Sequence, residues 1–289
     1  MAILKRDGGD RHPTEIYYED KGNGTPIVMI HGWPLSGVMF EYQVQDLLEA
    51  GFRVITYDRR GFGKSSRTGT TYDYDAMTDD LAALLEELDL QDVMLVGFSM
   101  GGGEVARYFT RHGGKRVTRA ALVSSVVPSI VKTASNPDGV PEEDLKDIMK
   151  ALKNDRQKFL TDFNKGFFGV SFLSQPVSDE LMHYYHMVAN SADPIATQET
   201  AKAWAYGNFV ADAKNISVPT LIVHGKEDET VPMGTSADRA AKLIPNNTYK
   251  KYDDAPHGLF ITHRKQLSND LAEFAKMPVH SRVGEAQLA

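Results

Sequence analysis

The sequence contains no cysteine and no long apolar run, and each absence removes a class of function. Without cysteine among its 289 residues, disulfides, thiolate catalysis and cysteine-ligated metals are excluded. No stretch approaches the roughly 18 apolar residues needed to cross a membrane, and the first residues do not form a secretory signal. The net charge of −7 argues against a nucleic-acid or anionic-membrane surface. These features predict a cytoplasmic protein.

Short apolar runs alternate with amphipathic segments along most of the chain. Runs such as residues 27–30 and 93–96 are continuous enough to be strands buried on both faces of a sheet. Alternation of this kind is typical of a mostly parallel, doubly wound α/β sheet. Within residues 128–217 the alternation lapses, and helical patterns and aromatic side chains dominate. We therefore predict an α/β core at residues 1–127 and 218–277, an inserted helical cap at 128–217 and a mobile tail at 278–289.

The individual elements follow from the same patterns. Glycine, proline and asparagine mark the turns between them, including a predicted hairpin turn at residues 21–24. We expect strands at residues 14–19, 27–30, 53–57, 93–96, 119–125, 219–223 and 249–252, and helices at 40–50, 73–89, 104–112, 236–243 and 264–276.

One of these strands ends in a glycine-flanked serine that matches G-x-S-x-G, residues 97–101. A turn this tight holds its central residue, Ser99, in a strained and exposed conformation, and glycine flanks it where side chains would clash. The free N–H groups of the following helix stabilise negative charge beside the serine. The alternative is a glycine-rich turn with an incidental serine. The strand before the motif and the helix after it favour a nucleophile.

A serine hydroxyl needs an adjacent base, usually a histidine that a carboxylate orients. Of the nine histidines, His257 is the best candidate, because it lies between a proline and a glycine in the loop after the last strand. His31 and His224 end buried strands and precede glycine, which favours a role in bracing turns. His183 and His186 lie three residues apart on an expected helix, but no further ligands point to a metal site there.

The orienting acid is expected after a strand, and three adjacent acidic residues follow the strand at 219–223. Asp228 is favoured over Glu227 and Glu229 because it lies in the turn just before a Val-Pro pair. Asp253 and Asp254 are too close in sequence to the candidate histidine to approach its ring from behind. We therefore predict that Asp228 is the carboxylate that orients His257 beside Ser99.

Acyl transfer also needs two N–H donors for the oxyanion of the tetrahedral intermediate. One is the backbone N–H after the nucleophile, here Met100, and the other comes from the loop after an earlier strand. In that loop Pro34 cannot donate, so Trp33 is the last donor before the chain turns. The glycine-rich loop at residues 58–66 lacks the spacing of a phosphate-binding motif, and we interpret it as a turn braced by an Asp–Arg contact.

Ser99, Asp228 and His257 follow the order Ser–Asp–His, and with them the chain resembles the α/β-hydrolase superfamily over residues 14–276. More narrowly, it resembles the cofactor-free (non-haem) haloperoxidases, also described as arylesterases and perhydrolases. That resemblance rests on HGWP at residues 31–34, YDRRGFGKSS at 57–66, GFSMGGGEVARY at 97–108 and APHG at 255–258.

The resemblance implies an activity without metal or organic cofactor. Ser99 would be the nucleophile, His257 the general base and acid, Asp228 its orienting carboxylate, and Trp33 and Met100 the oxyanion donors. In that family, carboxylic acid and peroxide give a peracid through an acyl-enzyme, and the peracid oxidises halide away from the enzyme. Relatives often form cyclic homo-oligomers, although no surface pattern here indicates one. They often carry histidine and threonine where this chain has Phe62 and Met100, so substrate preference does not transfer.

We therefore expect a serine hydrolase that acts on small esters, with peroxide able to replace water. Pro34 fixes the backbone after Trp33, so the Trp33 carbonyl would accept a hydrogen bond from peroxide; the alternative is a turn proline without catalytic effect. Two other functions stay open: an esterase or lactamase with incidental peroxidase activity, and a small-molecule-binding protein on a hydrolase scaffold. The residues predicted to line the pocket are Pro34, Phe98, Phe163, Phe168 and Trp204.

Overall fold

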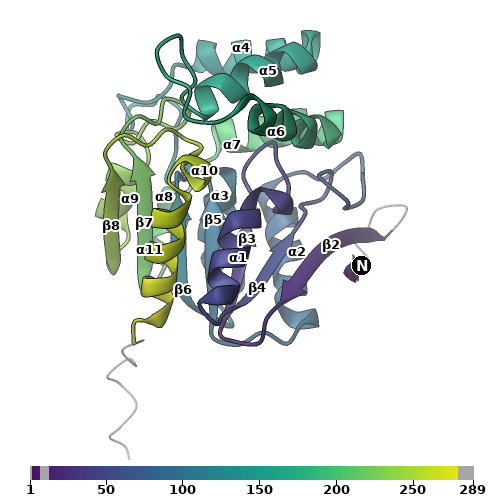
Figure 1. Cartoon of the computed structure of the whole chain (residues 1–289), viewed down its shortest axis with the longest axis vertical. Coiled ribbons are helices and arrows are strands. Elements are labelled where there is room, and N and C mark those ends of the chain that lie inside the picture. Colours follow the sequence, from purple (N-terminus) through teal and green to yellow (C-terminus); the bar gives the residue numbers. More distant parts are fainter. Residues whose placement is uncertain (1, 7–12, 279–289) are drawn as a thin grey trace, which may run out of the picture.

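Eight strands form one sheet in the computed structural model of the chain, which describes residues 2–6 and 13–278 (Figure 1). The strand order is β1-β2-β4-β3-β5-β6-β7-β8. The pairs β1–β2 and β2–β4 are antiparallel, and every other neighbouring pair is parallel. The predicted α/β sheet, mostly parallel, is confirmed. The strands are β1 Ala2–Arg6, β2 Thr14–Lys21, β3 Pro26–Ile30, β4 Arg53–Tyr57, β5 Val93–Phe98, β6 Val117–Val123, β7 Thr220–Gly225 and β8 Asn247–Tyr252.

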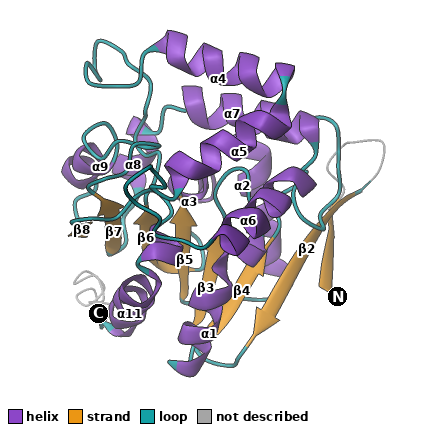
Figure 2. Ribbon diagram, turned by 45° about the horizontal axis from the view of Figure 1, so that its top comes forward, coloured by secondary structure: helices purple, strands orange, loops and turns teal. Residues whose placement is uncertain are grey.

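Helices cover both faces of this sheet, as Figures 1 and 2 show. On one face α1 packs against α11, and on the other α3 packs against α2 and α8. A short 3-10 turn, η1 Gly37–Phe40, leads into α1. The helices of the core are α1 Glu41–Glu49, α2 Tyr74–Glu87, α3 Met100–His112, α8 Val210–Asn215, α9 Ala237–Leu243, α10 Leu259–Thr262 and α11 Arg264–Lys276.

The central strands are buried on both faces, and the last strand is not. Every residue of β5 and of β7 is buried, as the continuous apolar runs predict for strands between two helical layers. The edge strand β8 is mostly half-buried or exposed instead, and Lys251 is one of its exposed residues. A charged edge of this kind discourages pairing with the strand of another chain.

A further group of helices lies between β6 and β7 in the chain and above the strand ends at the top of Figure 1. These helices are α4 Glu142–Asn154, α5 Arg156–Phe167, α6 Asp179–Ser191 and α7 Pro194–Tyr206. Within the stretch predicted as a cap, α8 packs against the core helices α3 and α9, whereas α5 and α6 reach the core through ring contacts of Phe167 and Tyr185 with Phe260 of α10. We propose that α4 to α7 are the cap, and the limits 128–217 stay a prediction.

The hairpin predicted at residues 21–24 is wrong, because β4 lies between β2 and β3. The glycines there satisfy a different requirement. A Cβ on Gly22 would lie 2.4 Å from the carbonyl oxygen of Phe52, and one on Gly24 would lie 1.9 Å from that of Gly51. The turn therefore needs glycine because it packs against the loop before β4. A local turn signal does not reveal which strands become neighbours.

Three smaller differences concern element limits. Strand β1 and the one-turn helix α10 were not predicted, and α10 is too short to show a helical period. Helix α3 begins at Met100, so the glycines of the motif form its first turn, not a loop before it. The predicted tail lies outside the described residues apart from Pro278. Within the described ranges, no helix combines the length and the apolar character needed to cross a membrane.

A buried ion pair joins the ends of β4 and α3. Arg59 Nε donates to Glu104 Oε1 at 2.6 Å, and the Tyr57 hydroxyl donates to Glu104 Oε2 at 2.8 Å. Burial raises the pKa of Glu104, and the charge of Arg59 opposes that rise. The brace predicted for the 58–66 loop was an Asp–Arg contact, and Arg60 of this loop makes one with Asp80, donating from Nε to Oδ2 at 2.7 Å and from Nη2 to Oδ1 at 2.8 Å. Asp58 accepts from the Gly37 and Lys64 N–H groups.

We expect Glu104→Gln to lower the free energy of unfolding by about 3–5 kcal/mol, because it leaves a buried guanidinium without its countercharge. Urea unfolding measures the change. Glu142→Gln is the matched control, since Glu142 pairs with Lys146 on the surface and such pairs contribute about 0–1 kcal/mol. Equal effects of the two substitutions would contradict the prediction.

Candidate active site

The turn at Ser99 has the strained geometry that the motif predicts. Ser99 follows β5 directly and has φ 52° and ψ −116°, a backbone conformation that residues other than glycine rarely adopt. A Cβ on Gly97 would lie 2.5 Å from the carbonyl oxygen of Gly101, and one on Gly101 would lie 2.4 Å from that of Ile30. The flanking glycines are therefore needed for β5, α3 and β3 to approach one another. The turn holds the serine at the end of the sheet.

The fold brings Ser99, His257 and Asp228 together from three separate elements. His257 Nε2 lies 3.0 Å from Ser99 Oγ, and His257 Nδ1 lies 2.7 Å from Asp228 Oδ2. All three residues are buried, whereas Glu227 and Glu229 are exposed. The expectation of an exposed Ser99 is therefore wrong, because residues of the core and the cap enclose the serine. A base within hydrogen-bond reach of a hydroxyl, itself oriented by a carboxylate, is the arrangement that activates serine.

Asp228 is held in its ionised form by its neighbours. Burial by itself raises the pKa of Asp228, but the charge and hydrogen bond of His257, together with the hydrogen bond of His224, outweigh burial and keep that pKa below its usual value. The other carboxylate oxygen, Oδ1, accepts the backbone N–H of Val231 at 2.8 Å. A carboxylate that stays charged can stabilise the imidazolium that forms when His257 takes a proton.

Both predicted oxyanion donors are available. Met100 is the first residue of α3, where a backbone N–H has no partner inside the helix. The Trp33 N–H has no acceptor in the part of the chain that the structure describes. The Trp33 indole Nε1 donates to the Thr197 carbonyl at 2.9 Å, which ties this loop to α7.

His31 braces this loop, as the sequence predicts, and does not contact Ser99. The backbone N–H of Arg59 donates to His31 Nε2 at 3.0 Å, and Arg59 Nη2 donates to the His31 carbonyl at 2.7 Å. Burial, followed by the charge of Arg59, keeps the pKa of His31 well below its usual value. The Arg59–Glu104 pair therefore connects the loop of Trp33 to the helix that begins with Met100.

A small, mostly apolar cavity of about 10 Å³ opens beside Ser99. Its wall combines a residue of the oxyanion loop with residues of the core and of the cap. The lining residues are Trp33, Ser99, Val126, Phe163, Trp204, Thr230 and Val231.

Two of the five predicted pocket residues, Phe163 and Trp204, line this cavity, and the other three do not. Phe98 lies behind the triad, with its ring 5.1 Å from that of His257. Phe168 packs on Tyr185 and Phe260, and Pro34 is buried outside the lining. Aromatic residues near the site in sequence were assigned to the pocket, but whether each faces the cavity depends on helix packing.

Sequence reasoning missed four residues that shape the site: Val126, Thr230 and Val231 in the cavity wall, and Phe167, whose ring lies 4.8 Å from that of His257. Val126 follows β6, and the other two wall residues follow the candidate acid. A search of every segment that follows a parallel strand would have included these three, because ligands bind at the carboxyl ends of such strands. Phe167 ends a cap helix, and no sequence signal places it on the histidine.

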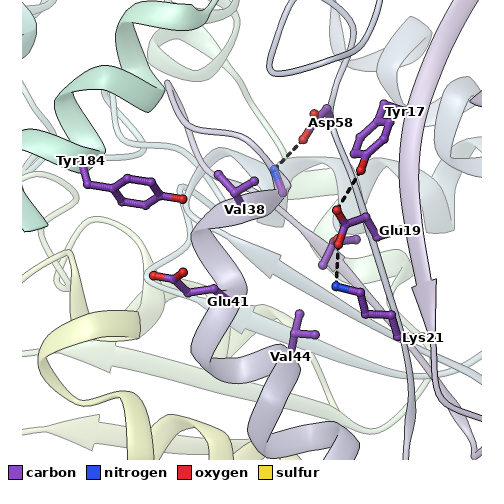
Figure 3. A pocket seen from close by; sticks show the side chains of 10 residues that line it. Tyr17, Glu19, Lys21, Val38, Glu41, Val44, Asp58 and Tyr184 are labelled. Carbon is purple, nitrogen blue, oxygen red and sulfur yellow. Dashed lines mark hydrogen bonds and ion pairs between the residues drawn. The ribbon is translucent and has the colours of Figure 1, made fainter. Parts of the chain in front are cut away.

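A separate surface pocket, shown in Figure 3, lies where β2 and β4 meet α1. Its polar groups bind one another: Gly37 N–H donates to Asp58 Oδ1, and Glu19 accepts from the Tyr17 hydroxyl and from Lys21. The lining contains none of the residues around Ser99. Among the described residues, no group of three or more histidine, aspartate or glutamate side chains could hold a metal ion.

A family model described as the alpha/beta hydrolase fold matches residues 25–264. The chain belongs to the α/β-hydrolase family. A solved bromoperoxidase from Bacillus anthracis is similar to this hydrolase with a TM-score of 0.91 and 43% identity, covering 96% of this chain and 100% of that one.

Curated relatives narrow the resemblance further. A putative non-heme chloroperoxidase from Synechocystis sp. is 44% identical over 90% of this hydrolase and 94% of its own length. A bifunctional esterase/perhydrolase from Acinetobacter calcoaceticus is 35% identical over 95% and 99%. The predicted resemblance to the non-haem haloperoxidases and perhydrolases is confirmed.

Proposed function

We propose that this α/β hydrolase cleaves small carboxylic esters through an acyl-enzyme on Ser99 and passes the acyl group to water or to hydrogen peroxide. The observation that carries the proposal is the continuous Ser99–His257–Asp228 hydrogen-bond chain at the wall of an apolar cavity. Relatives named as esterase/perhydrolase and as non-heme chloroperoxidase, each matched over most of the chain, support both outcomes.

In the first half-reaction, Ser99 Oγ attacks the ester carbonyl while His257 Nε2 accepts the hydroxyl proton. Asp228 stabilises the imidazolium, and the N–H groups of Trp33 and Met100 stabilise the oxyanion. Loss of one such donor typically costs about 3 kcal/mol of transition-state stabilisation. The carbon–oxygen bond to the alcohol then breaks, and the alcohol leaves with the proton from His257.

In the second half-reaction, water or hydrogen peroxide gives a proton to His257 and attacks the acyl carbonyl. The bond to Ser99 breaks, and Ser99 recovers the proton from His257. Water yields a carboxylic acid, and peroxide yields a peracid. Away from the enzyme, the peracid transfers one oxygen to halide, which gives hypohalous acid and the carboxylate. Every proton and electron in these reaction steps comes from the substrates.

The decisive experiment is a set of initial rates on an aryl acetate, on a lactam, and on acetate with peroxide and bromide, for wild type and Ser99→Ala. A fluorophosphonate probe tests Ser99 directly. We expect labelling of Ser99, ester hydrolysis, and peroxide-dependent halogenation that disappears in the variant. Faster turnover of the lactam would assign a lactamase. If the probe does not label Ser99 and none of the substrates is turned over, the protein is a binding protein.

The cavity favours short acyl groups, because Trp33, Phe163 and Trp204 enclose it. We expect Trp204→Ala to raise the ratio of kcat/KM for a butyrate ester over the acetate ester about tenfold, since each newly accommodated methylene contributes about 0.8 kcal/mol. A series of p-nitrophenyl esters measures the ratio. Phe172→Ala is the control, because Phe172 lies fully exposed on the cap. An unchanged ratio for Trp204→Ala would place the acyl group elsewhere.

Pro34 is proposed to favour peroxide over water. It follows Trp33 directly, and a Trp33 carbonyl held toward the cavity accepts a hydrogen bond from bound peroxide. Because one hydrogen bond contributes about 1 kcal/mol, we expect Pro34→Leu to lower the ratio of perhydrolysis to hydrolysis about fivefold. Peracid and acid formed from one ester give this ratio. Pro137→Leu is the surface control. If wild type, Pro34→Leu and this control all show the same ratio, Pro34 has no role in the choice between peroxide and water.

A further inference from the structure

We propose that His224 is a positioning residue for the reaction: a second histidine that holds the carboxylate of Asp228 against His257. This inference rests on the proposed function of the Ser99 site. His224 is the penultimate residue of β7 and is fully buried. Its Nε2 lies 2.8 Å from the Val231 carbonyl oxygen and 3.2 Å from Asp228 Oδ2.

The two ring nitrogens of His224 have different surroundings, and these show which nitrogen carries the proton of the imidazole ring. Both oxygens near Nε2 are acceptors, so Nε2 carries the proton, which it donates to the Val231 carbonyl and directs beside Asp228 Oδ2. Nδ1 is buried and has no partner among the described residues. A proton there would be a buried, unpaired donor, which is costly. The structure therefore assigns the neutral tautomer with its proton on Nε2.

Three donors thus converge on one carboxylate. Val231 N–H binds Oδ1 at 2.8 Å, while His257 Nδ1 and His224 Nε2 share Oδ2 at 2.7 and 3.2 Å. Since His224 also holds the Val231 carbonyl, it fixes the carboxylate and the loop that carries it from the rigid end of β7. A brace for the turn alone would need the contact to Val231 and not the contact to Asp228.

The shared oxygen has an electrostatic consequence. A donor on Oδ2 withdraws charge from the oxygen that stabilises the His257 imidazolium, so its removal makes Asp228 a stronger stabiliser of that cation. The other titratable groups on the adjoining loops are Glu227 and Glu229, which are exposed, Asp254, which binds His263 at 3.0 Å, and Lys226 and Asp253, which pair with each other at 2.5 Å. Phe98 and Phe167 are the rings against His257. His224 is therefore the neighbour that sets how strongly Asp228 stabilises the His257 imidazolium.

The test compares His224→Phe, which keeps a ring but removes the donor, with His224→Gln, whose amide nitrogen keeps a donor at similar reach. For hydrolysis of an aryl acetate, we expect His224→Phe to lower kcat/KM about tenfold and to move the acid limb of its pH profile up by about half a unit. His224→Gln restores both toward wild type. The control His263→Gln leaves the acid limb in place.

Several outcomes would overturn the proposal. One is a folded His224→Phe variant with the wild-type profile, and another is a His224→Gln variant that behaves like His224→Phe. If His224→Phe fails to fold, ¹⁵N-histidine NMR of the wild type decides, because a His224 proton on Nδ1 contradicts the assignment. That spectrum does not depend on activity, so failure of the proposed function, seen as wild type without esterase activity, is recognised separately.

Discussion

Ser99→Ala is expected to lower kcat for ester hydrolysis about 10⁶-fold, the loss typical of a removed serine nucleophile. His257 then has no hydroxyl to deprotonate, and no acyl-enzyme forms. Because the two oxyanion donors and the cavity remain, the variant should still bind substrate, and some rate above that of water should persist. Steady-state rates on an aryl acetate, with and without peroxide, measure the loss.

Ser135→Ala is the matched control, since Ser135 is exposed and belongs to none of the elements around the site. It should keep the wild-type rate and the wild-type labelling by a fluorophosphonate. Folding is checked by urea unfolding of both variants. Hydrolysis or peracid formation by Ser99→Ala at a rate near that of wild type would exclude Ser99 as the nucleophile, whatever its geometry.

Asp228→Asn is expected to lower kcat about 10⁴-fold with little change in the fold. An amide in this position can donate to His257 Nδ1, which moves the histidine proton to Nε2, where it faces Ser99 and cannot accept the serine proton. The amide also lacks the charge that stabilises the imidazolium. The same steady-state assay measures the effect, and Glu227→Gln, an exposed neighbour, is the control.

The pH dependence of stability gives an independent check on Asp228. Its pKa is lowered in the folded state, so the ionised carboxylate stabilises the fold fully above its unfolded pKa of about 4, and this contribution is lost as the pH falls toward the folded value. The difference in unfolding free energy between wild type and Asp228→Asn should therefore shrink on acidification below about pH 4. A difference that grows in acid would contradict the assigned ionisation.

Much of this molecule could be predicted from local patterns. The strands around the turn are continuous apolar runs, because a parallel sheet between two helical layers buries both faces. Ser99 is recognisable because a strand, a glycine-flanked serine and a helix follow one another directly. Asp228 and His257 are recognisable because each follows a strand, and the ends of parallel strands meet at one edge of the sheet. These inferences need only the order of elements along the chain.

The errors share a cause. Gly22 and Gly24 look like a hairpin turn because a turn signal is local, while the insertion of β4 between β2 and β3 is a non-local choice. Phe98 and Phe168 look like pocket residues because they are aromatic and close to the site, but their direction depends on how α5 and α10 pack around His257. No property of an isolated segment distinguishes a ring that lines a cavity from one that supports its wall.

The sequence by itself determined the chemistry and its approximate place: a serine at a strained turn, an acid and a histidine in the order of the family, and two backbone donors nearby. Only the tertiary structure decided the surroundings of these groups. It placed His224 on the same carboxylate oxygen as His257, tied the loop of Trp33 to Glu104 through Arg59, and enclosed a small cavity with Trp204. The physical reason is that chain order specifies which groups meet at a strand end, whereas packing between distant helices specifies their distances and orientations.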